Sequence, residues 1–382
     1  MDKKEKIQIL QKLININSVN GNELEVSKFI GKLLDKEKIQ YKIDAFDDKR
    51  ANLIAEIGSK KNKKVLCLTG HQDTVSILNE KSWKYNPFSA KIVGDKLYGR
   101  GSADMKSGLA AEIIALIELA NENFPISGTV RFIATAGEEY GTPGANRLNK
   151  KNAVKDVSAM VVGEPTSEQI IYAHSGSINY KIESYGKAWH SSEPQKGKNA
   201  ILGLTKYINA EKNLFNKTPK DKFLGLVQHS ITMIKGGSQV NIIPDYAELY
   251  GNIRPTVSFD NDKILNLINN KIDEINNKSP YKLKLSLIHN FHPVETNPKN
   301  DFVQLVKKTA NETVKKHRIN LETMNGATDA SVFIQKNPKM SVVILGPDKW
   351  SLAHQINEYT NISSFLETIE IYKKIITNFF KK

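Results

Sequence analysis

Three short apolar segments most constrain the fold of this chain, because each is followed by glycine and then by an acidic or imidazole side chain. They are Val65–Leu68 before Gly70 and His71, Thr129–Ala136 before Gly137, Glu138 and Glu139, and Ala159–Val162 before Gly163 and Glu164. Apolar runs without alternation are typical of strands covered on both faces. Residues at helical spacing, such as Leu109 and Ile113, lie between them. The pattern therefore predicts an α/β layered sheet.

The pattern changes near Ser177, where the expected strands alternate more strongly. Those strands are Ile178–Ser184, Ser230–Lys235, Ala247–Ile253 and Lys282–Leu287, with helices at Ala200–Phe215 and Asp262–Ile275. This order is typical of a small α+β domain with an antiparallel sheet. Helix–strand alternation returns after Pro293. We therefore predict one domain from residues 1–176 and 291–382, with residues 177–290 inserted as a second domain.

The length and the single cysteine limit the class of protein. A chain of 382 residues is long enough for two domains, and no apolar run approaches the ~20 residues that span a bilayer. No apolar segment of the kind found in signal peptides follows the N-terminus. Cys67 excludes an internal disulfide and fits a reducing compartment. We expect a cytoplasmic protein with no membrane partner.

The net charge of +14 raises the question of nucleic-acid binding. The excess is mainly lysine spread along the chain, with one tight cluster at Lys60, Lys61, Lys63 and Lys64 and no aromatic residues interleaved with it. We therefore expect no nucleic-acid partner. The charge favours attraction of small anionic substrates instead.

The side chains that follow the three strands are candidates for a metal site. Ligands bind outside the carboxyl ends of strands in open α/β sheets, and crowded carboxylates require a neutralising partner. His71, Glu139 and Glu164, together with Asp104 from the glycine-rich turn Tyr98–Gly108, would suit zinc. Each also has an ordinary explanation, since loop histidines and helix-capping acids are common. The turn itself could be a phosphate cradle or a simple cap.

If two ions bind, Asp104 is the natural shared ligand, because a carboxylate can offer one oxygen to each ion. Asp73, two residues after His71, could accept the other imidazole N–H and fix the ring. Glu138 is then left beside a ligand, where a free carboxylate could act as the general base.

Eight stretches resemble the two-zinc aminoacylase and dipeptidase superfamily, which includes acetylornithine deacetylases, succinyl-diaminopimelate desuccinylases and glutamate carboxypeptidases. They occur in order along nearly the whole chain: Leu68–Val75, Leu97–Gly108, Ala134–Glu139, Gly163–Thr166, Gly186–Ser192, Gly236–Asp245, Gly326–Ala330 and Ala353–Gln355. The resemblance implies a zinc-peptidase-like α/β catalytic domain with a central mixed sheet. It also implies that the inserted domain is a lid and dimerisation domain, so that the protein is a homodimer.

The resemblance implies a role for each matched residue. His71 and Glu164 would hold one zinc ion, Glu139 and His354 the other, and Asp104 would bridge them; cobalt could substitute for zinc. Glu138 would be the general base, and the peptide bond after Asp104 would be cis. His190 would stabilise the oxyanion in the partner subunit's site. The substrate carboxylate would be bound by Arg254 and Asn241, with the turn Gly326, Ala327 and Thr328 on the other side.

The implied reaction is hydrolysis of an N-acyl amino acid. The amino-acid sequences of residues 326–331 and 354–359 resemble those of a desuccinylase subgroup. This implies conversion of N-succinyl-LL-2,6-diaminopimelate to succinate and LL-2,6-diaminopimelate. Residues His174–Ser177 lack the arginine pair of well-studied desuccinylases, which removes one expected anchor for the succinyl carboxylate. The alternatives are acetylornithine deacetylation, dipeptide hydrolysis and a non-catalytic relative that only binds a ligand.

Overall fold

The computed structural model describes residues 1–59 and 62–381, so Lys60 and Lys61 of the lysine cluster lie outside the described residues. The described chain divides into two compact units. The large unit comprises Met1–Tyr172, Glu295–Glu322 and Thr328–Lys382, and the inserted unit comprises Ala173–Val294 and Thr323–Ala327. The two main boundaries between the units, after Tyr172 and after Val294, each lie four residues from the predicted boundaries after positions 176 and 290. The sequence did not indicate that a third segment, Thr323–Ala327, would join the inserted unit.

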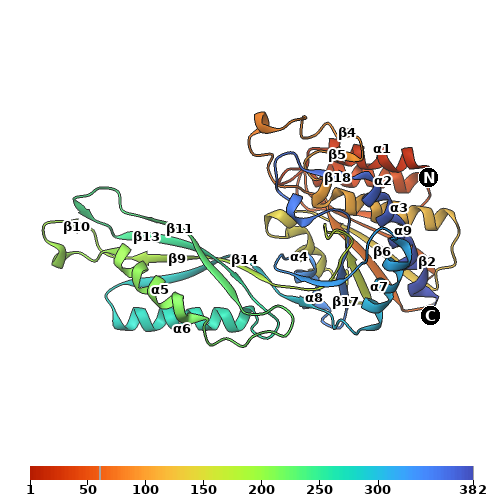
Figure 1. Cartoon of the computed structure of the whole chain (residues 1–382). Coiled ribbons are helices and arrows are strands. Elements are labelled where there is room, and N and C mark those ends of the chain that lie inside the picture. Colours follow the sequence, from red (N-terminus) through yellow and green to blue (C-terminus); the bar gives the residue numbers. More distant parts are fainter. Residues whose placement is uncertain (60–61, 382) are drawn as a thin grey trace. The chain divides into compact units, whose positions relative to one another are not determined.

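Within the described residues, nine strands form one mixed sheet in the order β1-β2-β6-β3-β7-β17-β8-β15, with β16 beside β8. Strands β2, β6 and β17 of this sheet are labelled in Figure 1. Their bounds are β1 Tyr41–Ala45, β2 Ala51–Ser59, β3 Val65–His71, β6 Gly128–Thr135, β7 Ala159–Val162, β8 Ile170–His174, β15 Val294–Glu295, β16 Leu321–Met324 and β17 Ser341–Ile344. The central strands β6, β3, β7 and β17 are parallel, whereas β1 and β2 are antiparallel. The predicted α/β fold with a mixed sheet is confirmed.

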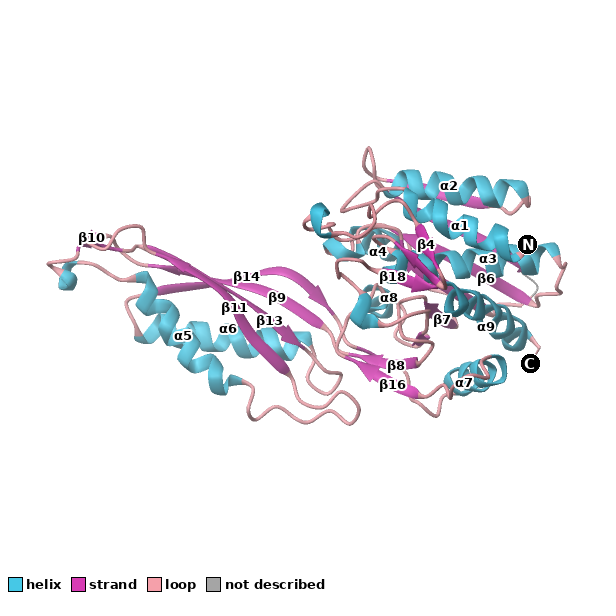
Figure 2. Ribbon diagram, turned by 45° about the horizontal axis from the view of Figure 1, so that its top comes forward, coloured by secondary structure: helices cyan, strands magenta, loops and turns pink. Residues whose placement is uncertain are grey.

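Helices cover this sheet, and they give β3 its complete burial. They are α1 Lys3–Asn15, α2 Glu23–Lys36, α3 Ser107–Asn121, α4 Pro143–Lys150, α7 Asp301–Thr313, α8 Ala330–Lys336 and α9 Ile362–Phe380. Helix α3 packs against α1 and α9 (Figure 2), and it is buried from Ser107 to Leu119. A smaller sheet has the order β18-β5-β4. Its bounds are β4 Lys91–Val93, β5 Lys96–Tyr98 and β18 Tyr359–Asn361.

Glycine allows the start of α3 to touch the turn after β7. A Cβ atom on Gly108 would lie 1.8 Å from the carbonyl oxygen of Gly163, which no side chain could occupy. A Cβ atom on Gly346 would lie 2.5 Å from the same oxygen and 2.5 Å from that of Glu164. The turn that carries Glu164 is therefore held tightly between α3 and the segment after β17.

The inserted unit contains an antiparallel sheet in the order β11-β13-β9-β14. Its elements are β9 Ser177–Tyr185, β10 Trp189–His190, α5 Ala200–Leu214, β11 Gln228–Gly236, β12 Ile242–Ile243, β13 Tyr246–Arg254, α6 Asn261–Lys278 and β14 Lys282–Phe291. Alternate residues of β9, such as Tyr180 and Ile182, are buried in a core shared with α5 and α6. This matches the alternation seen in the sequence. Over the part of the chain that the structure describes, every helix is too short or too polar to cross a bilayer.

Candidate metal centre

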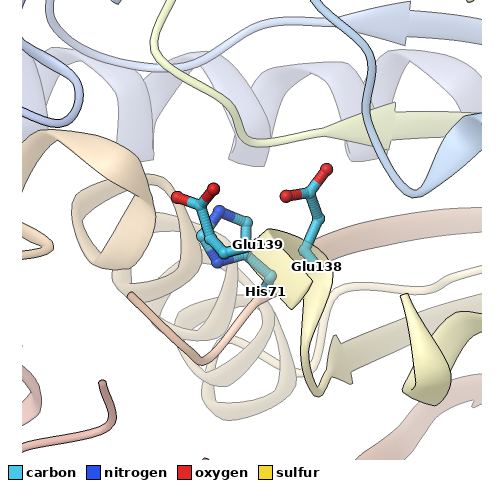
Figure 3. A group of neighbouring side chains, drawn as sticks. All are labelled: His71, Glu138 and Glu139. Atoms are coloured by element: carbon cyan, nitrogen blue, oxygen red, sulfur yellow. The ribbon is translucent and has the colours of Figure 1, made fainter. Parts of the chain in front are cut away.

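The parallel strands bring three of the predicted residues to one edge of the sheet. His71 is the last residue of β3, Glu139 follows β6, and Glu164 follows β7. Because β3 lies between β6 and β7, the carboxyl ends of these strands are adjacent. Figure 3 shows the ring of His71 and the carboxyl groups of Glu138 and Glu139 on the same side of the ribbon.

Asp104 reaches this edge from the turn of residues 102–106, which joins the smaller sheet to α3. The Asp104–Met105 peptide bond is cis, as the resemblance implied. His354 comes from the segment before β18, more than two hundred residues later. Its side chain is 50% exposed, whereas that of Asp104 is 6% exposed. The cluster is thus buried on one side and open at His354.

Asp104 belongs to two overlapping groups of possible metal ligands, one with His71 and Glu164 and the other with Glu139 and His354. Its Oδ1 atom lies 3.0 Å from His71 Nε2, and its Oδ2 atom lies 3.3 Å from His354 Nε2. Each group therefore receives a different oxygen of one carboxylate, which is the arrangement that a bridging ligand requires. His71 Nε2 is 3.7 Å from Glu164 Oε1, and His354 Nε2 is 2.8 Å from Glu139 Oε1.

Crowding of acids changes their protonation. Burial, and next the charge of Asp104, raise the pKa of both Glu139 and Glu164. Burial alone would also raise the pKa of Asp104, but hydrogen bonds with His354 and His71 lower it. The hydrogen bonds to Asp104 and Glu139 in turn raise the pKa of His354 to about 10. So many carboxylates can be ionised together only beside a cation.

The chemistry of the donor set fits such a cation. Within residues 1–59 and 62–381, the buried Oε2 atom of Glu164 has no hydrogen-bond partner, and a buried carboxylate oxygen without a partner is unfavourable. Imidazole nitrogens combined with carboxylate oxygens are typical ligands of zinc and similar divalent ions. The residues are therefore suited to a pair of divalent metal ions.

The structure corrects the predicted contact of Asp73. His71 Nδ1 lies 2.9 Å from the backbone carbonyl oxygen of Asp73, not within hydrogen-bond distance of its carboxylate. A carbonyl only accepts, so Nδ1 carries the proton and Nε2 is left for a metal. The carboxylate accepts instead from the backbone N–H groups of Gly137, Glu138 and Glu139, at 2.9, 3.0 and 3.1 Å. Asp73 therefore fixes the ring with its backbone and the acidic turn with its side chain.

Glu138 lies beside the two ligand groups and also forms a third possible group with His71 and Glu139. Burial, and next the charge of Glu139, raise its pKa well above the ordinary value. A carboxylate whose pKa is raised is a stronger base than an ordinary one, which suits a general base.

The predicted catalytic residue His190 and the predicted binding residues Asn241 and Arg254 belong to the inserted unit. His190 ends β10, is exposed, and lies with its Nδ1 atom 2.7 Å from Ser192 Oγ. Asn241 is next to it, since its carbonyl accepts from the N–H of Ser191 at 3.0 Å. Arg254 ends β13 and is partly buried; burial lowers its pKa, and no ion pair to it occurs among the described residues. An unpaired, partly buried guanidinium is available for a ligand carboxylate.

The turn Gly326, Ala327 and Thr328 lies at a boundary between the units. Gly326 and Ala327 belong to the inserted unit, whereas Thr328 belongs to the large unit. Thr328 is buried, and its hydroxyl accepts from the N–H of Ala330 at the start of α8.

Sequence reasoning missed two buried acids near the metal ligands. Asp329 is 3% exposed, its carboxylate accepts from the hydroxyl of Thr135, and burial raises its pKa to about 7. Glu358 is fully buried and contacts the backbone of the Asp104 turn. Asp329 lies within the matched stretch Gly326–Ala330, and Glu358 lies within residues 354–359, but neither residue was assigned a role. Their place in these stretches was the only signal, and it did not reveal their contacts.

The sequence matches peptidase family M20/M25/M40 over residues 67–378. It is 37% identical to a probable succinyl-diaminopimelate desuccinylase of Staphylococcus aureus, with 99% of this chain and 98% of the relative covered. It is 29% identical to a succinyl-diaminopimelate desuccinylase of Wolbachia pipientis, with 98% and 93% covered.

Solved structures share the fold at low sequence identity. An M20 family metallo-carboxypeptidase from Sulfolobus solfataricus superposes with a TM-score of 0.83 at 19% identity, covering 100% of both chains. A dinuclear metal binding peptidase of the M20 family from Bacillus subtilis gives 0.73 at 18% identity, covering 99% of this chain and 98% of that one. The chain therefore belongs to peptidase family M20/M25/M40 and is a hydrolase that acts on amide bonds.

Proposed function

We propose that this protein hydrolyses N-succinyl-LL-2,6-diaminopimelate to succinate and LL-2,6-diaminopimelate, with two zinc ions that cobalt can replace. The observation that carries the proposal is the position of Asp104, whose two oxygens face two different sets of ligands. Similarity to curated desuccinylases over the whole chain supports the choice of substrate. The buried free thiol of Cys67 fits a reducing compartment, so we place the reaction in the cytoplasm.

His71 and Glu164 would hold one ion, Glu139 and His354 the other, and Asp104 both. When bound, such ions lower the pKa of a water molecule and polarise the scissile carbonyl. Glu138 takes the proton of the attacking water and delivers it to the leaving amine. Asp73 orients this base, because its carboxylate binds the N–H groups of the turn that carries it.

The inserted unit supplies substrate binding and, in this proposal, the dimer contact. Arg254 and Asn241 bind a substrate carboxylate, and the turn Gly326, Ala327 and Thr328 contributes from the other side. His190 donates a hydrogen bond to the developing oxyanion in the partner subunit's site. The net charge of +14 favours an anionic N-acyl amino acid over a neutral peptide.

The acyl group is the part of the proposal that most needs a test. Residues His174–Ser177 lack the arginine pair found in well-studied desuccinylases, and in the structure the His174 ring is fully buried with its Nδ1 atom 2.9 Å from the carbonyl oxygen of Ser175. Burial lowers the pKa of His174 to about 4, so it is neutral and cannot replace the missing charge.

Purified protein loaded with zinc or cobalt should be assayed with N-succinyl-LL-2,6-diaminopimelate, N-acetylornithine and simple dipeptides. We expect the succinyl substrate to give the highest kcat/KM. Faster turnover of either alternative would reassign the substrate but keep the reaction class. Tight metal binding with no turnover of any amide would instead indicate a ligand-binding relative.

A further inference from the structure

Glu358 is a fully buried acid whose carboxylate faces the backbone of the Asp104 turn. Its Oε1 atom accepts from the N–H groups of Ala103 at 2.8 Å and Asp104 at 3.0 Å. Its Oε2 atom accepts from Arg100 Nη1 at 2.5 Å and from the N–H group of Gly101 at 3.2 Å. Four donors therefore converge on one carboxylate, and one of them is the N–H group of Asp104 itself.

The same residue is tied to the segment that carries His354. Glu358 immediately precedes β18, whose residue Tyr359 pairs with Tyr98 of β5. The Glu358 carbonyl accepts from the N–H group of Gly99 at 3.0 Å. Backbone and side chain of Glu358 thus both bind the chain just before Asp104, and His354 lies four residues upstream. Contacts of Glu358 therefore join two segments that each supply a metal ligand.

A carboxylate is the side chain that these donors require. Successive backbone N–H groups in a turn form a concave site for an anion, and each carboxylate oxygen can accept two hydrogen bonds. Arg100 balances the charge, with Nη2 bound to the carbonyl of Ser76 at 3.0 Å and its guanidinium 5.2 Å from the ring of Trp83. Glutamine has the same shape, but its NH₂ group would face donors and leave some of them unpaired.

We propose that Glu358 is a positioning residue for the metal centre, one that fixes Asp104 relative to His354 and so sets the affinity for the ion they share. This rests on the metal site proposed above. The distance that Glu358 would maintain is short, since Asp104 Oδ2 and His354 Nε2 are 3.3 Å apart. His354 also has a left-handed backbone, with φ of 62°, which surrounding contacts must maintain.

The test compares Glu358→Gln with Asp44→Asn, which removes another buried carboxylate. Asp44 is 7% exposed and binds Arg147 at 2.9 Å and Lys151 at 2.6 Å, in contact with none of the metal ligands. Metal-free full-length proteins are titrated with Co²⁺, and binding is followed by visible absorption. We expect Glu358→Gln to weaken at least one Co²⁺ site about 10- to 100-fold, whereas Asp44→Asn binds like the wild type.

Hydrogen exchange of the metal-free proteins supplies a second readout. The amides of Gly101, Ala103 and Asp104, which donate to the Glu358 carboxylate, should exchange faster in Glu358→Gln, with other amides of the large unit unchanged. The contrary outcome is faster exchange throughout the large unit of Glu358→Gln, together with an equal loss of Co²⁺ affinity in Asp44→Asn. Glu358 would then only stabilise the fold in general, and the proposal would be overturned. A folded Glu358→Gln protein with wild-type Co²⁺ affinity and spectrum would also overturn it.

Arg100→Lys covers the case in which Glu358→Gln does not fold. Lysine keeps the positive charge, but its single ammonium group lacks the two separate guanidinium nitrogens with which Arg100 binds Glu358 and the carbonyl of Ser76. A lowered Co²⁺ affinity in this variant supports the proposal, and an unchanged affinity contradicts it. A wild-type protein that binds no Co²⁺ would overturn the metal site as well, so the two failures are distinguishable. Co²⁺ binding without hydrolysis of any amide would leave this inference intact and remove only the proposed reaction.

Discussion

Asp104 faces both candidate ligand groups, so its loss should affect two ions whereas loss of an outer ligand should affect one. We expect Asp104→Ala to retain neither ion at micromolar free metal and Glu164→Gln to retain one. Metal content after equilibrium dialysis, with stoichiometry from calorimetry on metal-free protein, measures this directly. Two tightly bound ions in Asp104→Ala would contradict a bridging role.

Glu138 belongs to neither set of metal ligands in the proposed assignment. Its substitution should therefore slow hydrolysis without weakening metal binding. Glu138→Gln should lower kcat about 10²- to 10⁴-fold, with metal content unchanged. Glu25→Gln, at a side chain that is 52% exposed on α2, is the matched control and should keep full activity. Full turnover by Glu138→Gln would exclude it as the base.

The candidate residues themselves were largely predictable, but the atoms they use were not. The acids after β3, β6 and β7 follow from local signals, namely an apolar run, a glycine and a polar side chain. Spacing placed Asp73 near His71, yet it could not tell that the backbone carbonyl contacts the ring. His354 lies in the cluster because of packing between segments that are far apart in the sequence. Only the resemblance therefore identified it, among eight histidines, as a candidate metal ligand.

At the scale of elements, the packing of α3 on the turn after β7 depends on Gly108. Alanine there would place Cβ 1.8 Å from a backbone oxygen, so the helix or the turn must move. We expect Gly108→Ala to lower the free energy of unfolding by about 1–3 kcal/mol, measured by urea denaturation. In Gly31→Ala, the atoms nearest to the new Cβ belong to the Tyr41 side chain, at 2.8 Å, and a side chain can move more easily than backbone, so the loss should be smaller. Equal stability of the two variants would contradict tight packing at Gly108.

Long strands and helices were predicted because their residue periodicity is local. The sequence did not reveal that Thr323–Ala327 joins the inserted unit, or that β16 pairs with β8. Both depend on short segments whose pairing partner lies far away along the chain, and four-residue strands carry little periodic signal. The antiparallel sheet of the inserted unit was easier to predict, since buried and more exposed residues alternate along the nine residues of both β9 and β13.

For the whole molecule, the contact least accessible to sequence reasoning is that between Glu358 and Asp104, which are 254 positions apart. Each residue occurs in a recognisable stretch, but nothing local indicates that one binds the other. In the large unit the C-terminal part of the chain lies beside the N-terminal part, as the pairing of β18 with β5 shows. The metal centre should therefore be lost as a unit when either part is displaced.

The proposed dimer makes a prediction that depends on the assembly as a whole. If His190 acts in the partner subunit's site, His190→Ala and Glu138→Gln homodimers are each impaired at both sites. A heterodimer of the two variants has one site with Glu138 from one subunit and His190 from the other. Random subunit exchange makes half of the dimers mixed, so roughly a quarter of wild-type activity should return on mixing.

Activity of the mixture, measured after mild dissociation and reassociation, distinguishes this arrangement from one in which His190 serves its own subunit. In that case every site in the mixed dimer carries one of the two substitutions, and mixing restores nothing. Mixing each variant with itself controls for the treatment. Sedimentation on the same samples must show dimers, since a monomer with full activity would exclude any contribution from a partner subunit.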